Sequence, residues 1–353
     1  MLNYHHGLAY QGAIKMAPKF AEDVLETEIE TQSSNLNETI PYKQYLNEVK
    51  KEPKVERDAH TRVDDMLEFF GSEYNENKSR KEYKIFTEDP LHNGKRAFYG
   101  DNLHGKGGKD GWGVDRLVDK IKSGGENLAS HKRIPLLLGP VGAGKTDIIN
   151  QLARYFEHYT RLEEGKMRTW DWKNLYEDEN GNRIIPGQHP DDDRKEAPMH
   201  QSPLLLLPKE RREYALAEVE KDLDRSYDHL RDGGLVPESK FYKKHLMSHY
   251  LKNGDVNNEK EALQKILDNH VEVKRLVADE SLGKCIGRFE PRKSKNQDAS
   301  DLLGGINDSR RAIYGKSDPR SFDYAGELNK AHRGIFIGTE LLKGDDEHLY
   351  IFL

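Results

Sequence analysis

The sequence IPLLLGPVGAGKT occupies residues 134–146 and joins a short apolar run to the pattern G-x-x-x-x-G-K-[ST]. The apolar residues 134–138 predict a strand that is buried on both faces of a parallel sheet. Beyond the pattern, residues 147–159 carry apolar side chains on one face, which predicts an amphipathic helix. A buried strand, a glycine-rich turn and a helix in this order are the structural setting in which the pattern binds phosphate.

Each residue type in the pattern serves phosphate binding in its own way. Three glycines remove side chains, so that a triphosphate can approach the backbone N–H groups at the positive end of the helix dipole. Lys145 is predicted to reach the β- and γ-phosphates, and Thr146 to hold Mg²⁺ through its hydroxyl. The sequence therefore predicts a site for ATP and Mg²⁺. The residues assigned to it are Gly139, Pro140, Val141, Gly142, Ala143, Gly144, Lys145 and Thr146.

A second part of the predicted site follows later in the chain. Residues 335–339, IFIGT, predict another buried strand, expected beside strand 134–138, and Glu340 follows it. A carboxylate at the end of such a strand can hold a metal-bound water or polarise the attacking water. Lys145 and Glu340 are therefore the predicted catalytic residues. The alternative is that Glu340 only ends a strand, because Thr339 stands where such strands usually carry an aspartate.

Composition excludes several classes of protein. The 353 residues contain 56 Lys and Arg against 62 Asp and Glu, so the net charge of -6 gives no electrostatic reason to expect binding to nucleic acid. Cys285 is the one cysteine, which excludes an internal disulfide and a cysteine-based zinc site. No apolar run approaches the roughly 20 residues of a membrane span, and the N-terminus lacks the apolar core of a signal peptide. We expect a cytoplasmic protein that makes no membrane contact.

The chain divides into three predicted parts. Residues 1–40 are polar and acidic, which predicts a mobile N-terminal segment. Residues 41–95 form a helical region in which a proline breaks the helices. Residues 96–353 form the P-loop domain, with a strand at 169–172 (TWDW) and a charged helical insertion over about 209–275. The expected fold class is α/β, with a P-loop core whose parallel sheet is flanked by helices.

Two runs in the last third of the chain resemble a known family. They are KNQDASDLLGGIND at 295–308 and KSDPRSFDYAGELNKAHRGIFIGTELLKG at 316–344. Both are similar to the AAA domain of the PrkA-type serine protein kinases, as are the P-loop stretch, AFYG at 97–100 and YKQYLNEVKKEP at 42–53. The resemblance extends over residues 40–353 and is most specific over residues 295–340, whereas the P-loop is shared with many families.

This resemblance implies an AAA-type ATPase domain attached to serine/threonine protein kinase activity in microbial stress and starvation responses. ATP and Mg²⁺ are the implied cofactors, and a protein is the implied substrate. Glu340 matches the final glutamate of the family's strand motif, and Asn329 and Arg333 match the segment before that strand. Ile337 stands where members often have a second glutamate, so any role of that carboxylate is absent here.

Members of that family continue for hundreds of residues, whereas Leu353 ends this chain 13 residues after Glu340. We therefore expect an incomplete AAA core that binds ATP and turns it over slowly. The missing C-terminal region, in cis or in trans, is one expected partner, and a second copy in a homo-oligomer is another.

Three functions remain open from the sequence. The first is the ATPase part of a PrkA-like protein kinase, the second an AAA ATPase linked to protein remodelling or proteolysis, and the third a non-catalytic nucleotide-binding regulator. The chain lacks the VAIK-like lysine, the HRD loop and the DFG of eukaryotic-type kinases; its segment 332–334 reads HRG, with glycine at the base position. The kinase prediction thus depends on the resemblance, and the ATP prediction on residue chemistry.

Overall fold

The structure is a computed structural model. It describes residues 36–76, 80–87, 91, 114–125, 134–138, 144–178, 181–220, 227–254, 256–291, 299–341 and 351. The predicted N-terminal segment, 1–40, therefore lies almost entirely outside the described residues. Of the two units into which the chain divides, the second, Thr39–Leu353, contains every element named below.

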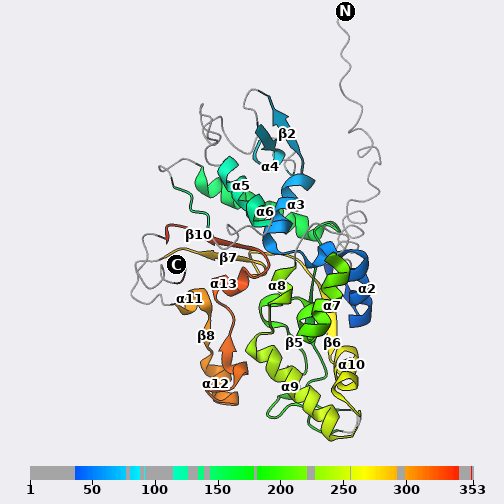
Figure 1. The fold of residues 1–353 in the computed structure, drawn as a ribbon. Coiled ribbons are helices and arrows are strands. Elements are labelled where there is room, and N and C mark those ends of the chain that lie inside the picture. The colour runs from blue at the N-terminus through cyan, green and yellow to red at the C-terminus, as the bar shows by residue number, and fades with distance from the viewer. Residues whose placement is uncertain are drawn as a thin grey trace, which may run out of the picture. The chain divides into compact units, whose positions relative to one another are not determined.

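The described residues form a mixed α/β structure (Figure 1). The helices are α2 (Tyr42–Lys51), α3 (Ala59–Phe69), α4 (Lys84–Thr87), α5 (Val114–Gly125), α6 (Lys145–Arg161), α7 (Lys209–Glu220), α8 (Asp228–Arg231), α9 (Pro237–Lys252), α10 (Glu259–Asn269), α11 (Ser300–Leu303), α12 (Asp308–Tyr314) and α13 (Glu327–Lys330). The strands are β1 (Thr39–Ile40), β2 (Ser72–Asn75), β3 (Arg80–Tyr83), β4 (Met167–Trp172), β5 (Lys195–Glu196), β6 (Val271–Leu276), β7 (Ile286–Phe289), β8 (Gly305–Ile306), β9 (Phe322–Asp323) and β10 (Ile335–Gly338). Among these described elements, no helix combines the length and the apolar character that crossing a bilayer requires.

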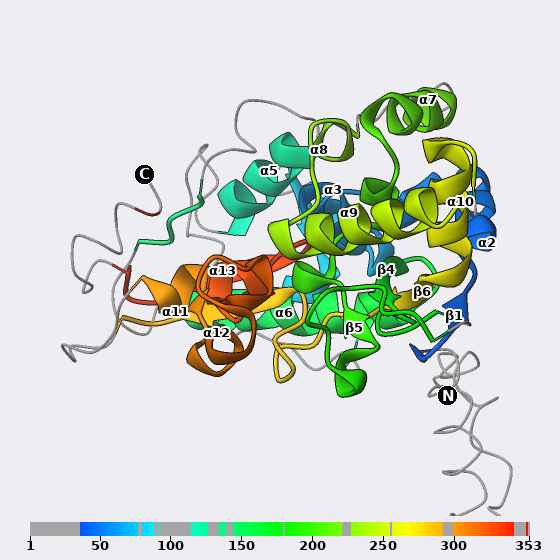
Figure 2. The same cartoon turned by 90° about the horizontal axis from the view of Figure 1, so that it is seen from below.

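The largest sheet of the described residues is antiparallel, with strand order β1-β6-β4-β5. β4 and β6 pair along their whole length, with Trp170 opposite Val273. β4 confirms the strand predicted at 169–172. Tyr242 of α9 stacks against Trp172 with 6.1 Å between ring centroids, so α9 packs over this sheet (Figure 2).

Two hydrophobic clusters make up the core. The first surrounds the antiparallel sheet and takes apolar side chains from α2, α9 and α10. The second joins α3, α5 and α6 to β7 and β10. β4 and β6 contribute to both, because Met167 and Leu276 at one end of the paired strands belong to the second cluster, while Trp172 and Val271 belong to the first. The sheet therefore connects the two cores.

The helices near the start of the described chain agree with the sequence pattern. A 3-10 turn at Pro53–Glu56 separates α2 from α3. Proline has no N–H to continue a helix, so the break occurs where the sequence predicted one. Asp58 caps α3 by accepting a hydrogen bond from the Thr61 N–H at 2.7 Å.

The predicted helical insertion over 209–275 requires a correction at its end. α7, α8, α9 and α10 confirm its helical character as far as Asn269. Val271–Leu276, however, is strand β6, in which Val271 and Val273 are buried and the residues between them are half-buried. This alternation has the period of two that marks a strand, and pairing with β4 outweighs the surrounding helical pattern.

The strand predicted at 134–138 is wrong in this structure. These residues have no regular secondary structure, and Ile134, Leu136 and Leu138 are exposed. An apolar run becomes a buried strand only when a neighbouring strand takes its backbone hydrogen bonds and another layer covers it. Among the described residues no strand pairs with 134–138, so its apolar composition alone was not enough to make it a strand.

Parallel pairing is confined, in the described part of the chain, to β7 and β10. β10 confirms the strand predicted at 335–339, although it ends at Gly338, and its neighbour is β7 rather than 134–138. The expected parallel sheet is therefore represented by a two-stranded pair, and the remaining described sheets are antiparallel.

Candidate nucleotide site

The N-terminus of α6 carries the last residues of the phosphate-loop motif. Gly144 is the N-cap residue, and its φ of 77° and ψ of 11° lie in the left-handed region that glycine adopts without steric cost. Among the described residues no side chain caps α6, and its first hydrogen bond runs from the Ile148 N–H to the Gly144 carbonyl at 3.1 Å. Within the described part of the chain, no side-chain cap therefore takes up the first N–H groups of α6, and Asp147 places one carboxylate in its first turn.

The buried face of α6 fixes this N-terminus in place. Its apolar residues recur at helical spacing and pack in the second cluster: they are Ile148, Leu152, Tyr155, Phe156 and Tyr159. Gln151, also buried, donates from its side-chain amide to the Ile85 carbonyl of α4 at 3.0 Å. A helix held along its length presents its first residues in a constant direction, as phosphate binding requires.

The structure places three of the residues predicted to bind phosphate. Gly144, Lys145 and Thr146 are consecutive at the start of α6; Lys145 is half-buried and Thr146 is exposed. The remaining five predicted residues, 139–143, lie outside the described residues. A left-handed glycine, followed by a helix that starts with Lys-Thr and that no described side chain caps, fits a phosphate with Mg²⁺. The assignments of Lys145 and Thr146 therefore stay predictions with suitable local geometry.

Glu340 lies just beyond β10, on the far side of a bend. The Thr339 N–H still donates to the Phe289 carbonyl of β7 at 2.9 Å, after which Glu340 turns with φ 53°. A positive φ in a residue other than glycine costs energy and ends the strand. The Glu340 side chain is exposed, as a group that contacts a ligand or water must be.

Arg288 of β7 connects the P-loop helix to the strand that precedes Glu340. Its Nη2 donates to Asn150 Oδ1 of α6 at 2.9 Å, and in the parallel register it lies opposite Ile337 of β10. Glu340 is three residues further along from Ile337. One residue of β7 therefore connects α6, through its side chain, with β10, through backbone strand pairing.

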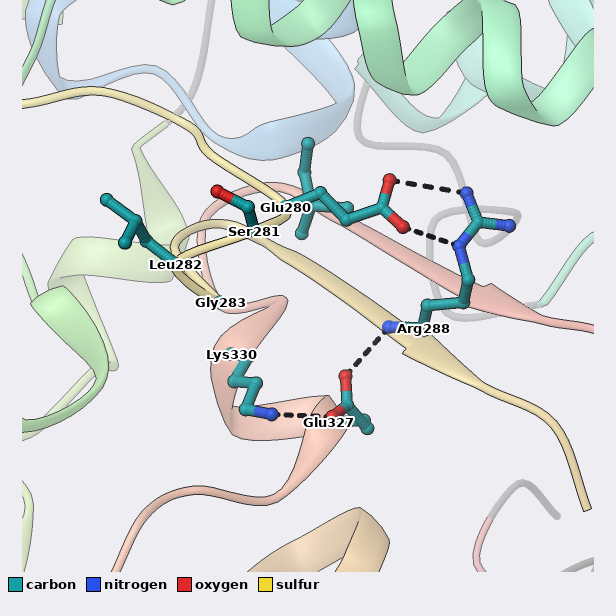
Figure 3. Close-up of a pocket in the computed structure, with 8 residues that line it drawn as sticks. Glu280, Ser281, Leu282, Gly283, Arg288, Glu327 and Lys330 are labelled. Carbon is teal, nitrogen blue, oxygen red and sulfur yellow. Dashed lines mark hydrogen bonds and ion pairs between the residues drawn. The ribbon is translucent and has the colours of Figure 1, made fainter.

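Further contacts hold the Arg288 side chain in one position (Figure 3). Glu280 accepts hydrogen bonds from Nε at 2.6 Å and from Nη2 at 3.3 Å. The Arg288 backbone N–H donates to Glu327 of α13 at 2.8 Å, and Lys330 donates to the other oxygen of Glu327 at 2.6 Å. These groups line a cavity of about 320 Å³. Because the charges are paired with one another, we interpret the cluster as a brace and not as a ligand site.

No pattern in the sequence predicts this brace. Its members stand at positions 150, 280, 288, 327 and 330, and no spacing in the sequence relates them. The one clue in the sequence was the arginine within the strand-like run IGRF at 286–289. An unpaired charge is costly inside a half-buried strand, so an arginine at this position needs a partner.

Two glycines allow the elements around β7 to approach closely. A Cβ on Gly287 would lie 1.9 Å from the Glu327 carbonyl oxygen, and one on Gly334 would lie 1.8 Å from the Cys285 carbonyl oxygen. Both distances are far below van der Waals contact, so each position requires glycine. Gly334 in HRG therefore has a packing role at the start of β10, where the Ile335 N–H donates to the Cys285 carbonyl at 2.8 Å.

Residues of the two runs that resemble the PrkA family make structural contacts. Arg320 of SDPR forms an ion pair with Asp318 at 2.7 Å and stacks its guanidinium over Phe241 of α9. Asn329 donates to the Leu303 carbonyl at 2.7 Å. The Arg333 guanidinium lies 3.5 Å from the buried carboxylate of Glu56. These three residues of the pattern therefore make contacts that hold the fold together.

Comparison with known proteins gives the family. The model of the PrkA AAA domain family matches residues 40–353. A relative named ATP-dependent protease PrkA, from Bacillus subtilis (strain 168), is 30% identical over 311 residues, which cover 88% of this chain and 38% of the relative. This chain thus matches well under half of that relative's length. No solved structure matches. With a family match that covers nearly all of the described residues, the chain belongs to the PrkA AAA domain family.

Proposed function

We propose that this chain binds Mg-ATP at the start of α6 and hydrolyses it, as the ATPase domain of an assembly that acts on protein substrates by remodelling or proteolysis. The observation that carries the proposal is the left-handed Gly144 directly before a helix that begins with Lys145 and Thr146 and that no described side chain caps. Family membership supports ATP use, and the relative's printed name, ATP-dependent protease, supports the link to proteolysis.

In the proposed mechanism each residue has a role that follows from its position. Lys145 would contact the phosphates and offset their charge, and Thr146 would supply a hydroxyl ligand to Mg²⁺. The metal, when bound, would stabilise negative charge that develops on the phosphate oxygens. Glu340 would accept a hydrogen bond from a water molecule and orient it toward the terminal phosphate. Arg288 would position α6 relative to the strand that carries Glu340, without touching the nucleotide.

A second candidate is a serine/threonine protein kinase, which the resemblance of the runs 295–308 and 316–344 implies. The two functions differ in where the terminal phosphate goes. Incubation with γ-labelled ATP and a protein acceptor separates them: label on a serine supports the kinase. Free phosphate whose release rises when unfolded protein is added supports the remodelling ATPase. ATP binding without either product supports a nucleotide-binding regulator.

The nucleotide site itself is tested with Lys145→Ala. Calorimetry with Mg-ATP should show binding to the parent chain and a loss of affinity of roughly 100-fold or more in the variant, since a charge-assisted contact to phosphate is removed. Lys260→Ala is the matched control, because Lys260 is exposed and also lies in the first turn of a helix, α10, but follows no glycine-rich loop. Equal affinity of Lys145→Ala and the parent would show that ATP binds elsewhere.

A further inference from the structure

A groove unrelated to the nucleotide site lies between three helices. α2, α7 and α10, together with the 3-10 turn Pro203–Leu206, enclose a volume of about 660 Å³. Apolar side chains form its floor: Leu46, Val49, Leu204, Leu207, Leu263 and Leu267. Leu46 and Leu207 are only partly buried, so part of this apolar surface faces solvent. An open apolar floor of this kind is typical of a site where another protein packs.

An aromatic residue stands at the edge of the groove. Tyr214 of α7 lines it and is 72% exposed. Ala215 beside it is half-buried and also lines the groove. An exposed tyrosine offers a large apolar area and a hydroxyl at low entropic cost, and tyrosine is enriched where proteins bind one another.

The rim of the groove is positively charged. Lys43 and Lys50 on α2 and Arg211 on α7 line it, and all three are exposed. Among the described residues none of the three has an ion-pair partner. Glu218 is the one acidic residue in the lining. This local excess of positive charge contrasts with the net charge of -6 for the whole chain, so the rim selects for an acidic ligand.

The lining also determines the backbone form of the ligand. Helices and a 3-10 turn surround the groove, and no strand edge contributes to it. An extended peptide would find no backbone partner there, and its unpaired N–H and C=O groups would lose water without replacement. A helix satisfies its own backbone and can place leucines at intervals of three and four residues against the floor.

We propose that this groove binds an acidic amphipathic helix of a partner protein. Apolar residues of that helix would rest on the leucine floor and against Tyr214, and its carboxylates would face Lys43, Lys50 and Arg211. Binding would not depend on nucleotide, because the groove takes no residue from α6, β7 or β10. The proposal is thus independent of the ATPase function and assigns this face to the recruitment of a substrate or a regulator.

The test uses a fluorescein-labelled synthetic peptide of about 18 residues, a length that supports a helix, with leucine on one face and glutamate on the other. Its partner peptide has lysine in place of every glutamate. Anisotropy with the full chain should show that the acidic peptide binds at least about tenfold more tightly than the basic one, and that the preference shrinks at roughly 0.5 M NaCl. Equal binding of the two peptides would overturn the proposal.

Substitutions in the groove test whether the peptide binds there. The double substitution Lys43→Glu and Lys50→Glu should lower the affinity for the acidic peptide by about tenfold or more, because two attractions to its carboxylates become repulsions. Tyr214→Ala should also lower this affinity. The matched control is Lys51→Glu with Lys244→Glu, which reverses two exposed lysines outside the groove and should leave affinity unchanged. Because all these side chains are exposed, folding is expected to persist, and thermal unfolding of each variant verifies it.

Two results would contradict the proposed occupant. Unchanged affinity of the Lys43/Lys50 variant would place the peptide elsewhere. A dimer in sedimentation experiments that Tyr214→Glu converts to a monomer would show that a second copy of this chain fills the groove instead of an acidic partner.

Discussion

At the residue scale, the proposed chemistry depends on two side chains that the chain supplies from different elements. Lys145 begins α6, whereas Glu340 follows β10. The first would act on the phosphates in the bound state and the second on the attacking water, so their substitutions should have different kinetic signatures.

Glu340→Gln should leave Mg-ATP affinity nearly unchanged and reduce hydrolysis by roughly 10²–10⁴-fold, the usual contribution of a positioned base. The amide keeps the size of the side chain but cannot take a proton. Calorimetry and a phosphate-release assay on the same preparation measure the two effects. If Glu340→Gln hydrolyses ATP at the parental rate, Glu340 only ends the strand.

Arg288→Gln tests the brace between α6 and β7. The substitution removes the ion pair with Glu280 and weakens the link to Asn150. We expect kcat to fall by roughly 10- to 100-fold, because a shift of about 1 Å between Lys145 and Glu340 suffices for that loss, while KM changes little. A role limited to stability would instead lower the melting temperature with kcat intact. Arg311→Gln, in an exposed pair on α12, is the control.

The phosphate-loop residues could be proposed from the sequence because the motif is contiguous and its chemistry is local, and their role in binding ATP stays a prediction. Lys145 and Thr146 were assigned from their neighbours alone, and α6 begins at Lys145. Arg288 was not predictable, since its partners at 150, 280 and 327 meet only once the chain has folded. The same holds for Arg320, which lies in the run 316–344 but whose stacking on Phe241 depends on tertiary packing.

At the scale of elements, α9 carries a buried carboxyl group that should make stability depend on pH. Glu238 lies in the first turn of α9 and is 2% exposed. Burial raises its pKa from 4.5 to about 7, although Lys195, Arg310 and a hydrogen bond from Tyr242 oppose the rise. A carboxyl with a raised pKa stays protonated in the folded chain at pH values where the unfolded chain has released the proton.

The free energy of unfolding should therefore fall as pH rises from about 4.5 to about 7, and this contribution should level off above that window. The loss is on the order of 3 kcal/mol for a shift of this size. Glu238→Gln removes the titrating group and keeps an acceptor for the Tyr242 hydroxyl. Urea unfolding of parent and variant at several pH values should give a difference that grows between pH 5 and 7. A constant difference would contradict this account.

Elements with a strong local pattern were predicted, and elements that depend on distant partners were not. α2, α3, α6 and β4 follow from apolar spacing within their own sequence. β6 was assigned to a helix because its charged neighbours in 209–275 are helical, although Val271 and Val273 already alternate with polar residues. The prediction for 134–138 was wrong in the opposite direction, because a strand was expected where none forms. The run has the composition of a buried strand, but no described strand pairs with it.

At the scale of the whole molecule, the division of the core into two hydrophobic clusters predicts which parts of the fold a bound nucleotide stabilises. α6 packs in the second cluster with α3, α5, β7 and β10, whereas α9 and α10 belong to the first. Regions of a protein open locally with different free energies, and a ligand protects the regions whose opening disrupts its site. Binding at α6 should therefore stabilise the second cluster first.

Hydrogen exchange of the full chain with and without Mg-ATP measures this. At a nucleotide concentration of about 100 times Kd, linkage adds about 2.7 kcal/mol to openings that abolish binding, which slows exchange there by about 100-fold. We expect that slowing in α6, β7 and β10, and little change in α9 and α10, whose local openings leave the site intact. β4 and β6 share both clusters and should show an intermediate effect. Lys145→Ala should remove the protection everywhere. Equal protection of both clusters by nucleotide would mean that they open together, as one cooperative unit joined through the β4–β6 sheet.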